Sequence, residues 1–220
     1  MTDDAPTLSL TVARDTPKSL RTRARILDHA TRLFAEVGYS AASNSRIAEA
    51  AGLTRGAMLY HFPTREALID ATVEYIQNER GRMLAAAADD APHGADMMDH
   101  AIDAYWRLLR LPAFRAFAEL EAVAKTDPDV AQRIAKAQAD FDQAHAGETF
   151  SRLLSAGGGA RFQASRDLAR FMLEGLARAT LTYDSEARIE NLLAVIKRAI
   201  HMLNRKGDLH DLWPEDTAAR

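Results

Sequence analysis

The stretch LTRGAMLYHF, residues 53–62, gathers several hydrogen-bond donors on one short predicted helix. The side chains expected to face outward are Thr54, Arg55, Gly56, Leu59, Tyr60 and His61, and those expected to face inward are Ala57, Met58 and Phe62. Hydroxyl, guanidinium, phenol and imidazole groups suit phosphate oxygens and base edges, and Gly56 lets the helix backbone approach a surface closely. The pattern favours contact with nucleic acid, although Tyr60 and His61 packing locally stays an alternative on these residues alone.

The neighbouring residues predict how this helix is held. A second short helix precedes it, with Ser43 as its N-cap and Gly52 at its end, and a tight glycine-containing turn between two short helices is typical of a helix-turn-helix. A longer helix is expected from Thr22, ended by Gly38, and a fourth helix capped by Thr64 is expected to reach about residue 88. The apolar stripe of the first helix is Ile26, Ala30, Leu33, Phe34 and Val37.

Charge is unevenly divided along the chain. Residues 18–65 contain eight basic and three acidic side chains, a net charge of +5, so the remainder carries −8 of the total of −3. A basic segment on an acidic body suggests that only the segment meets a polyanion, with local fluctuation as the alternative.

Composition narrows the class of protein further. The chain has no cysteine, which excludes disulfides, zinc–thiolate sites and a thiol nucleophile. No apolar run is long enough to span a membrane, and the acidic start does not resemble a signal peptide, so a cytoplasmic location is expected. No alternating strand pattern occurs. The fold expected is all-α, with an arm at 1–17, a helix-turn-helix DNA-binding domain at 18–66, a helical body at 67–204 and a tail at 205–220. The later helices are predicted near 96–110, 113–125, 128–154, 165–183 and 186–204.

Residues 21–76 resemble the DNA-binding region of the tetracycline-repressor (TetR) family. The motifs that carry the resemblance are LFAEVGY, IAEAAGLTRG and LYHFPTREAL. The resemblance implies a recognition helix of residues 54–60 in the major groove, with Arg55 reading guanine and Arg21, Arg23 and Arg25 beside the minor groove. The implied DNA-binding residues are Ser43, Asn44, Ser45, Arg46, Thr54, Arg55, Gly56, Tyr60, His61 and Arg65. Leu59 and Asn44 depart from the family pattern, which commonly has an aromatic residue at the first position and an apolar residue at the second.

The resemblance also implies a homodimer and an effector site in the body. The last two helices carry wide apolar stripes, and the dimer-interface residues expected on them are Phe171, Gly175, Ala179, Leu192, Ile196 and Ile200. Residues 97–120 concentrate Met, Tyr, Trp and Phe, which suits an adaptable apolar cavity. The candidate wall residues are Met98, Tyr105, Trp106, Phe114, Phe117, Phe141 and Met172, each with plain core packing as the alternative.

One group of acidic and histidine side chains could in principle bind a divalent cation. Asp96, Asp99, His100 and Asp103 share one predicted helix face, but a solvated acidic face explains them equally well, so neither metal nor cofactor is expected. His29, His145 and His201 are expected to stand alone.

The resulting hypothesis is a transcriptional repressor that binds a palindromic operator in double-stranded DNA as a homodimer. A small lipophilic effector would release it, and no membrane partner is expected. An activator or a regulator without ligand stays open. An enzyme is disfavoured because no phosphate loop, metal motif or nucleophile pattern occurs, and the acidic body argues against a non-specific nucleoid protein.

Overall fold

The computed structural model describes residues 16–94, 96–144, 160–179 and 185–204, and all regular elements in these ranges are α-helices. In chain order they are α1 (Pro17–Val37), α2 (Asn44–Ala50), α3 (Arg55–His61), α4 (Arg65–Asp89), α5 (Met97–Leu108), α6 (Pro112–Ala124), α7 (Pro128–Ala144), α9 (Ala160–Ala179) and α10 (Glu186–Asn204). The expectation of an all-α chain is confirmed.

Local capping explains where the first four helices begin. The hydroxyls of Ser43, Thr54 and Thr64 accept hydrogen bonds from backbone N–H groups three residues further on, as predicted. The start of α1 differs from the prediction. It begins at Pro17, inside the expected arm and five residues before Thr22, because Thr16 caps it and proline fits the first helical position.

The predicted ends of the body helices differ in two places. Helix α9 begins at Ala160 rather than near residue 165, and α7 is described to Ala144, so its predicted extension to residue 154 lies outside the described residues. The predicted end of α9 at residue 183 and the tail at 205–220 also lie outside them, as does nearly all of the expected arm. None of the described helices has the length and apolar character needed to cross a membrane.

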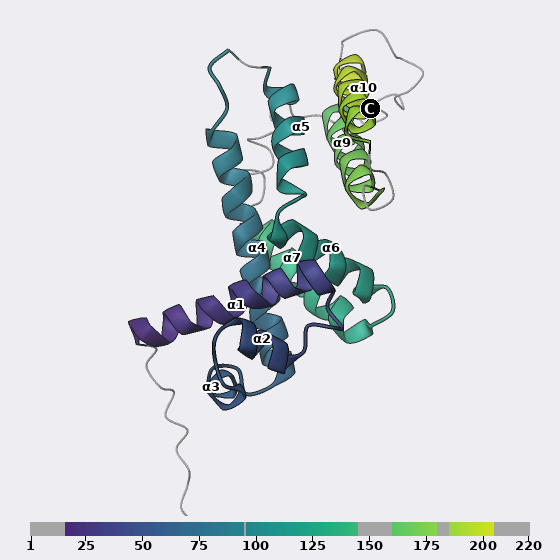
Figure 1. Ribbon diagram of the computed structural model, residues 1–220. Helices are drawn as coiled ribbons and strands as arrows, with labels where there is room; N and C mark the ends of the chain where they lie inside the picture. Colours follow the sequence, from purple (N-terminus) through teal and green to yellow (C-terminus); the bar gives the residue numbers. More distant parts are fainter. Residues whose placement is uncertain (1–15, 95, 145–159, 180–184, 205–220) are drawn as a thin grey trace, which may run out of the picture.

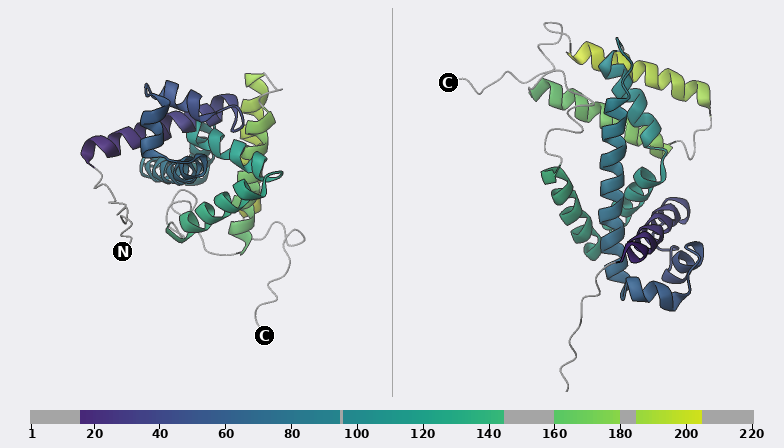
Figure 2. Two further views of the ribbon diagram at one scale, coloured as in Figure 1. Left: turned by 90° about the horizontal axis from the view of Figure 1, so that it is seen from below. Right: turned by 90° about the vertical axis from the view of Figure 1, so that its left-hand side faces the viewer.

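Helix α4 joins the two ends of the molecule. Helices α1, α2 and α3, with the first turn of α4, form the lower part of Figure 1, which we call the head; α5, α9 and α10 lie at the other end. Figure 2 shows α4 as the long column between them, with α6 and α7 beside its middle. A movement of α4 in the upper body therefore reaches the head directly.

The head has a core that continues into the body. Ile26, Phe34, Ile47, Met58 and Phe62 are almost completely buried and belong to one apolar cluster with residues of α4, α6 and α7. Arg115 of α6 also donates a hydrogen bond of 2.9 Å to the Ala35 carbonyl in α1. Side chains of the head and of the body thus share one core, which holds the two parts together on both sides of residue 66.

A second apolar cluster holds the upper helices together. It is formed by Leu84, Ala101, Ile102, Ala104, Tyr105, Trp106, Leu108, Phe114, Ala169, Leu173, Ile196 and Ile200. Its members come from α4, α5, α6, α9 and α10, so the upper body packs as one unit.

Candidate nucleic-acid interface

The turn between α2 and α3 depends on one glycine. Gly52 has φ of +64°, a region that side chains other than glycine seldom adopt, and Leu53 N–H donates to the Ala48 carbonyl at 2.8 Å across the turn. Gly38, at the end of α1, likewise has positive φ, at +81°. The helix-turn-helix predicted from these positions is present.

Helix α3 is held to the head by two side chains on its inner face. Met58 and Phe62 are buried, and they lie four residues apart, so they share one side of the helix. Ala57 was predicted to join them but is exposed, because it is rotated by about 100° from Met58. The outer side presents Thr54, Arg55 and Gly56, and Tyr60 is 73% exposed.

Arg23 fixes the C-terminal end of α3. Its Nη1 donates a hydrogen bond of 2.7 Å to the His61 carbonyl, and its guanidinium lies 4.4 Å from the centre of the Phe62 ring. The expected role beside the minor groove was assigned to Arg21, Arg23 and Arg25 alike, but Arg23 is occupied within the head whereas Arg21 and Arg25 are exposed. The sequence pattern did not reveal this positioning role, since the contact joins residues 38 positions apart.

The starts of α2, α3 and α4 meet around a hollow of about 400 Å³. It is lined by Ser40, Ser43, Asn44, Ser45, Arg55 and Arg65, five of which were predicted to bind DNA. Ser40, in the loop after α1, was missed because nothing in its local pattern marks it. Arg55 makes no hydrogen bond or ion pair with any described residue, so its guanidinium is free to contact a ligand.

Arg65 is instead occupied within the head. It donates to the Ala42 carbonyl at 2.7 Å, to Asn44 Oδ1 at 3.0 Å and to the Tyr39 carbonyl at 3.3 Å, and it lies over the Tyr39 ring. Burial is the main cause that raises the pKa of Tyr39 above its usual value. The unusual Asn44 thus has a structural explanation, since its side-chain oxygen accepts from Arg65. A phosphate contact by Arg65 remains a prediction.

Replacing Arg65 with glutamine should destabilise the chain by about 1–3 kcal/mol, because three hydrogen bonds from a charged donor are lost or weakened. Chemical unfolding followed by circular dichroism measures the change. Arg46→Gln is the matched control: Arg46 is exposed and donates to the Ala41 carbonyl alone, so its loss should cost about 0.5 kcal/mol. Equal stability of the two variants would contradict this role of Arg65.

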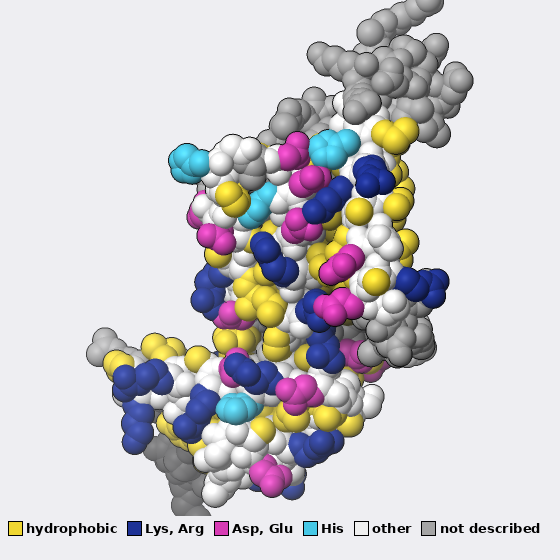
Figure 3. Space-filling view, turned by 45° about the horizontal axis from the view of Figure 1, so that its top comes forward, with side chains coloured by type: hydrophobic (Ala, Val, Ile, Leu, Met, Phe, Trp, Pro, Cys, Tyr) yellow, Lys and Arg dark blue, Asp and Glu magenta, His cyan; other side chains and the backbone are white. Residues whose placement is uncertain are grey.

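The charge of the head is concentrated on its outer surface. Figure 3 shows Lys and Arg side chains gathered over the α1 end of the head. At the start of α4, Glu66 fills the position where an anion could bind: hydrogen bonds from its own backbone N–H and from Thr64 lower the pKa of its carboxyl group. The positive end of α2, whose first residues line the hollow, has no such acid in its first turn. Of the N-termini of α2 and α4, that of α2 is therefore the better suited to bind a phosphate group.

The outer face of α9 and α10 is apolar and exposed. Figure 3 shows hydrophobic side chains along this edge of the upper body. Of the residues predicted for the dimer interface, Phe171 is 63% exposed, Leu192 38%, and Gly175 and Ala179 are also exposed. Leu168, Val195 and Met202 share this exposure, although they were not among the six residues named for the interface.

Two of the residues predicted for the dimer interface lie elsewhere. Ile196 and Ile200 are almost fully buried inside the chain, where they pack in the second apolar cluster. The apolar stripe on α10 is wide enough to face both the core of its own chain and the outer surface. Ile196 and Ile200 lie on the side that packs within the chain.

The predicted wall residues of an effector cavity lie mostly in packed cores. Tyr105, Trp106 and Phe114 belong to the second cluster and Phe117 to the first, while Met98 is half-buried against the second. Met172 was placed wrongly, because it faces outward on α9 beside Phe171. The side chain of Phe141 lies outside the described residues.

A hollow of about 580 Å³ lies between α4 and α7 instead of among these residues. It is lined by mostly polar residues: Asp70, Val73, Glu74, Gln77, Asn78, Asp129, Gln132, Arg133, Lys136, Ala137 and Asp140.

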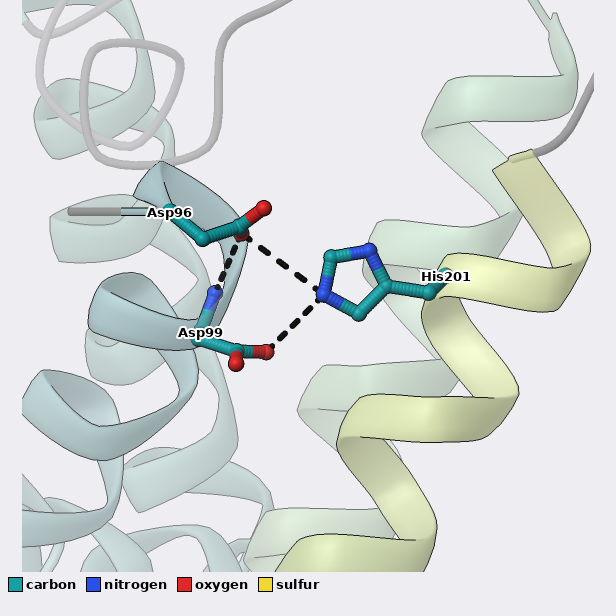
Figure 4. Close-up of side chains that lie close together, drawn as sticks. All are labelled: Asp96, Asp99 and His201. Carbon is teal, nitrogen blue, oxygen red and sulfur yellow. Dashed lines mark hydrogen bonds and ion pairs between the residues drawn. The ribbon is translucent and has the colours of Figure 1, made fainter. Parts of the chain in front are cut away.

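The acidic face of α5 has partners that the sequence did not indicate. His201 of α10, expected to stand alone, lies 3.0 Å from Asp99 and 3.6 Å from Asp96 (Figure 4). His100 Nε2 lies 2.9 Å from the Ala87 carbonyl, and Asp103 accepts from Lys197 at 2.6 Å. Helices α5 and α10 are thus joined by polar contacts. Of the four residues considered as one metal set, Asp96 and Asp99 face His201, whereas His100 and Asp103 have other partners.

Comparison with known proteins identifies the head. Residues 26–72 match a family described as "Bacterial regulatory proteins, tetR family". The HTH-type transcriptional repressor Rv1474c of Mycobacterium tuberculosis is 32% identical over 54% of this chain and 59% of its own length. The HTH-type transcriptional repressor AcnR of Corynebacterium diphtheriae is 32% identical over 60% of this chain and 65% of its own. The chain thus matches about three-fifths of the length of these curated relatives.

Solved structures share the fold over most of the chain. A transcriptional regulator from Saccharomonospora viridis in complex with choline covers 83% of this chain and 96% of its own, with a TM-score of 0.62 and 18% identity. The multidrug binding protein EbrR complexed with imidazole covers 80% of this chain and 93% of its own, with a TM-score of 0.52 and 21% identity. Residues 26–72 thus carry the DNA-binding region of the TetR family of bacterial regulatory proteins, and the solved structures share the fold over most of the chain.

Proposed function

We propose that this chain is a sequence-specific DNA-binding transcriptional regulator, acting as a repressor that a small molecule releases from a palindromic operator. The observation that carries the proposal is the outer face of α3. Arg55 and Tyr60 are exposed on a helix whose other side is fixed by Met58 and Phe62, and Arg55 makes no hydrogen bond or ion pair with the described residues. Donors held in this way on a rigid helix suit base edges in a major groove.

The names of the relatives support the same function. Rv1474c and AcnR are both named transcriptional repressors. In this proposal residues 18–66 bind DNA and residues 67–204 bind the effector and a second copy of the chain. Its action would be on chromosomal DNA in the cytoplasm, by binding rather than by catalysis.

The second copy is inferred from the outer face of α9 and α10. Leu168, Phe171 and Val195 are between 46% and 63% exposed, and six of the eleven exposed large apolar side chains among the described residues lie on these two helices. An exposed apolar face of this kind marks an interface, and a two-fold axis through it would present two α3 helices to the two halves of a palindrome.

An effector is inferred from the structural neighbours. One was solved with choline and another with imidazole, which are small molecules bound by those proteins. A ligand in this chain would act only through different affinities for the DNA-binding and released arrangements of α4.

Titration against the DNA upstream of the gene tests the function. The chain should retain a preference for one palindromic fragment over scrambled DNA of equal length when salt is raised from about 50 to 200 mM, because base contacts survive the loss of electrostatic attraction. Equal affinity for both fragments at every salt concentration would refute sequence-specific regulation.

A further inference from the structure

Arg80 is a buried cation in the upper half of α4 without an acidic partner. It is 8% exposed, and its Nη1 donates to Gln77 Oε1 at 2.6 Å. Its Nε is shielded from solvent and has no hydrogen-bond partner, and the Nη1–Gln77 contact is the one hydrogen bond that Arg80 makes with the described residues. The Nε–Nη2 edge, which binds a carboxylate through two parallel hydrogen bonds in many proteins, is therefore unused.

The charges of Glu121 and Glu174 act to raise the pKa of Arg80, but each carboxylate is bonded to another group. Glu174 on α9 accepts from the Tyr105 hydroxyl at 2.8 Å and from Arg170 Nε at 2.8 Å, and Glu121 on α6 pairs with Arg178 at 3.5 Å. Arg170 places a second positive charge in the neighbourhood. Burial lowers the pKa of Arg80 and raises that of Tyr105. None of these groups accepts a hydrogen bond from Arg80, so its Nε–H is open to a ligand carboxylate.

Aromatic rings flank the same guanidinium. It lies 3.9 Å from the centre of the Phe117 ring and 5.2 Å from that of Phe114, which stabilises the cation without satisfying its N–H groups. Buried donors of this kind are rare in folded proteins, because the lost hydrogen bonds to water are not replaced. Their recurrence at binding sites gives Arg80 a functional explanation.

We propose that Arg80 anchors the carboxylate of a small organic acid that has an apolar body, and that this acid is the effector. The carboxylate pairs with the Nε–Nη2 edge, and the apolar body packs against the aromatic side chains around it. The inference rests on the proposed regulator function and specifies the chemical class of its effector.

The position of Arg80 indicates how a ligand reaches it and how the DNA-binding head responds. Gln77, which holds Arg80, also lines the hollow between α4 and α7, so a ligand in that hollow is one side chain away from the guanidinium. Because Nε is shielded from solvent, the side chains around it must separate to admit a carboxylate. Arg65 lies fifteen residues earlier on the same helix, about 22 Å along its axis, so a displaced α4 alters the DNA-binding head.

Matched acids and amides test the proposal without DNA. The probes are octanoate and 4-phenylbutyrate, each paired with its neutral amide, and inorganic phosphate. They are titrated into the full chain by calorimetry, with the unfolding temperature as a second readout. At least one acid should bind tenfold or more tightly than its amide, since the amide lacks the charge that Arg80 pairs with. Phosphate should bind far more weakly than that acid, as it has no apolar body.

Two variants locate the effect. Arg80→Met should remove the preference for acid over amide, whereas Arg82→Met, whose side chain is 71% exposed on the same helix, should keep it. Four results would each overturn the proposal. In the first three, the natural chain binds none of the probes, binds acid and amide equally, or binds phosphate as tightly as the acid; in the fourth, Arg80→Met keeps the preference for acid over amide. If Arg80→Met fails to fold, the acid–amide comparison on the natural chain still decides. Because the readout needs no operator, a failure of DNA recognition is distinguishable from a failure here.

Discussion

Gly175→Leu is expected to convert the proposed dimer into monomers and to weaken binding to the proposed palindromic operator by about a hundredfold or more. A Cβ atom added at residue 175 meets nothing within 4 Å among the described residues, and the residue is exposed on α9. The substitution should therefore leave the fold of the single chain intact, and replacing a helical glycine should favour the helix by about 1 kcal/mol. Any loss of assembly then reports on a second chain that approaches Gly175 closely.

The measurement is molar mass by sedimentation or light scattering, followed by titration against operator DNA. Gly175→Ala is the matched control, since it gains most of the helix propensity with a single added methyl group and should remain dimeric. A monomer has one α3 to place in one half-site and loses the second half of the base contacts. A leucine variant with unchanged mass would show that the dimer is built elsewhere.

Local chemistry made the head predictable from sequence. Ser43, Thr54 and Thr64 each cap the helix that follows by accepting a hydrogen bond from the backbone N–H three residues ahead. Gly52 supplies the positive φ of the turn, so each signal and its effect lie within one short segment. Met58 was placed correctly for the same reason, because an apolar side chain on a short helix beside a turn has a single core to enter.

The errors arise where a residue's surroundings come from distant segments. Ile196 belongs to a stripe that faces both its own chain and the outer surface, and periodicity alone does not say which. His201 meets Asp99 across a separation of 102 residues, and Arg80 is buried by helices that come later in the chain. A single sequence identifies what such residues are, but the packing of α4, α5, α6 and α10 determines what they touch.

Arg55→Ala is expected to relax the preference for one base pair in each half-site while leaving the fold unchanged. Arg55 lines the hollow at the starts of α2, α3 and α4 and forms no bond to any described residue, so its removal breaks nothing within the head. A bidentate contact from arginine to guanine is worth roughly 1–3 kcal/mol of discrimination, which corresponds to about a 5- to 150-fold loss in each half-site.

Binding to a library of operators, each changed at one position, separates base reading from attraction to phosphate. If Arg55 reads a base, the natural protein should discriminate strongly at one position per half-site, and Arg55→Ala should bind all four bases there nearly equally. If Arg55 contacts phosphate, the variant should weaken binding to every operator by the same factor and reduce the salt dependence, because fewer counterions are released. Arg46→Ala is a useful comparison: Arg46 is exposed at the start of α2 but its Nη1 already donates to the Ala41 carbonyl, so a smaller and uniform effect is expected from it. A uniform loss in Arg55→Ala would assign base reading to the other outward groups of α3, Thr54 and Tyr60.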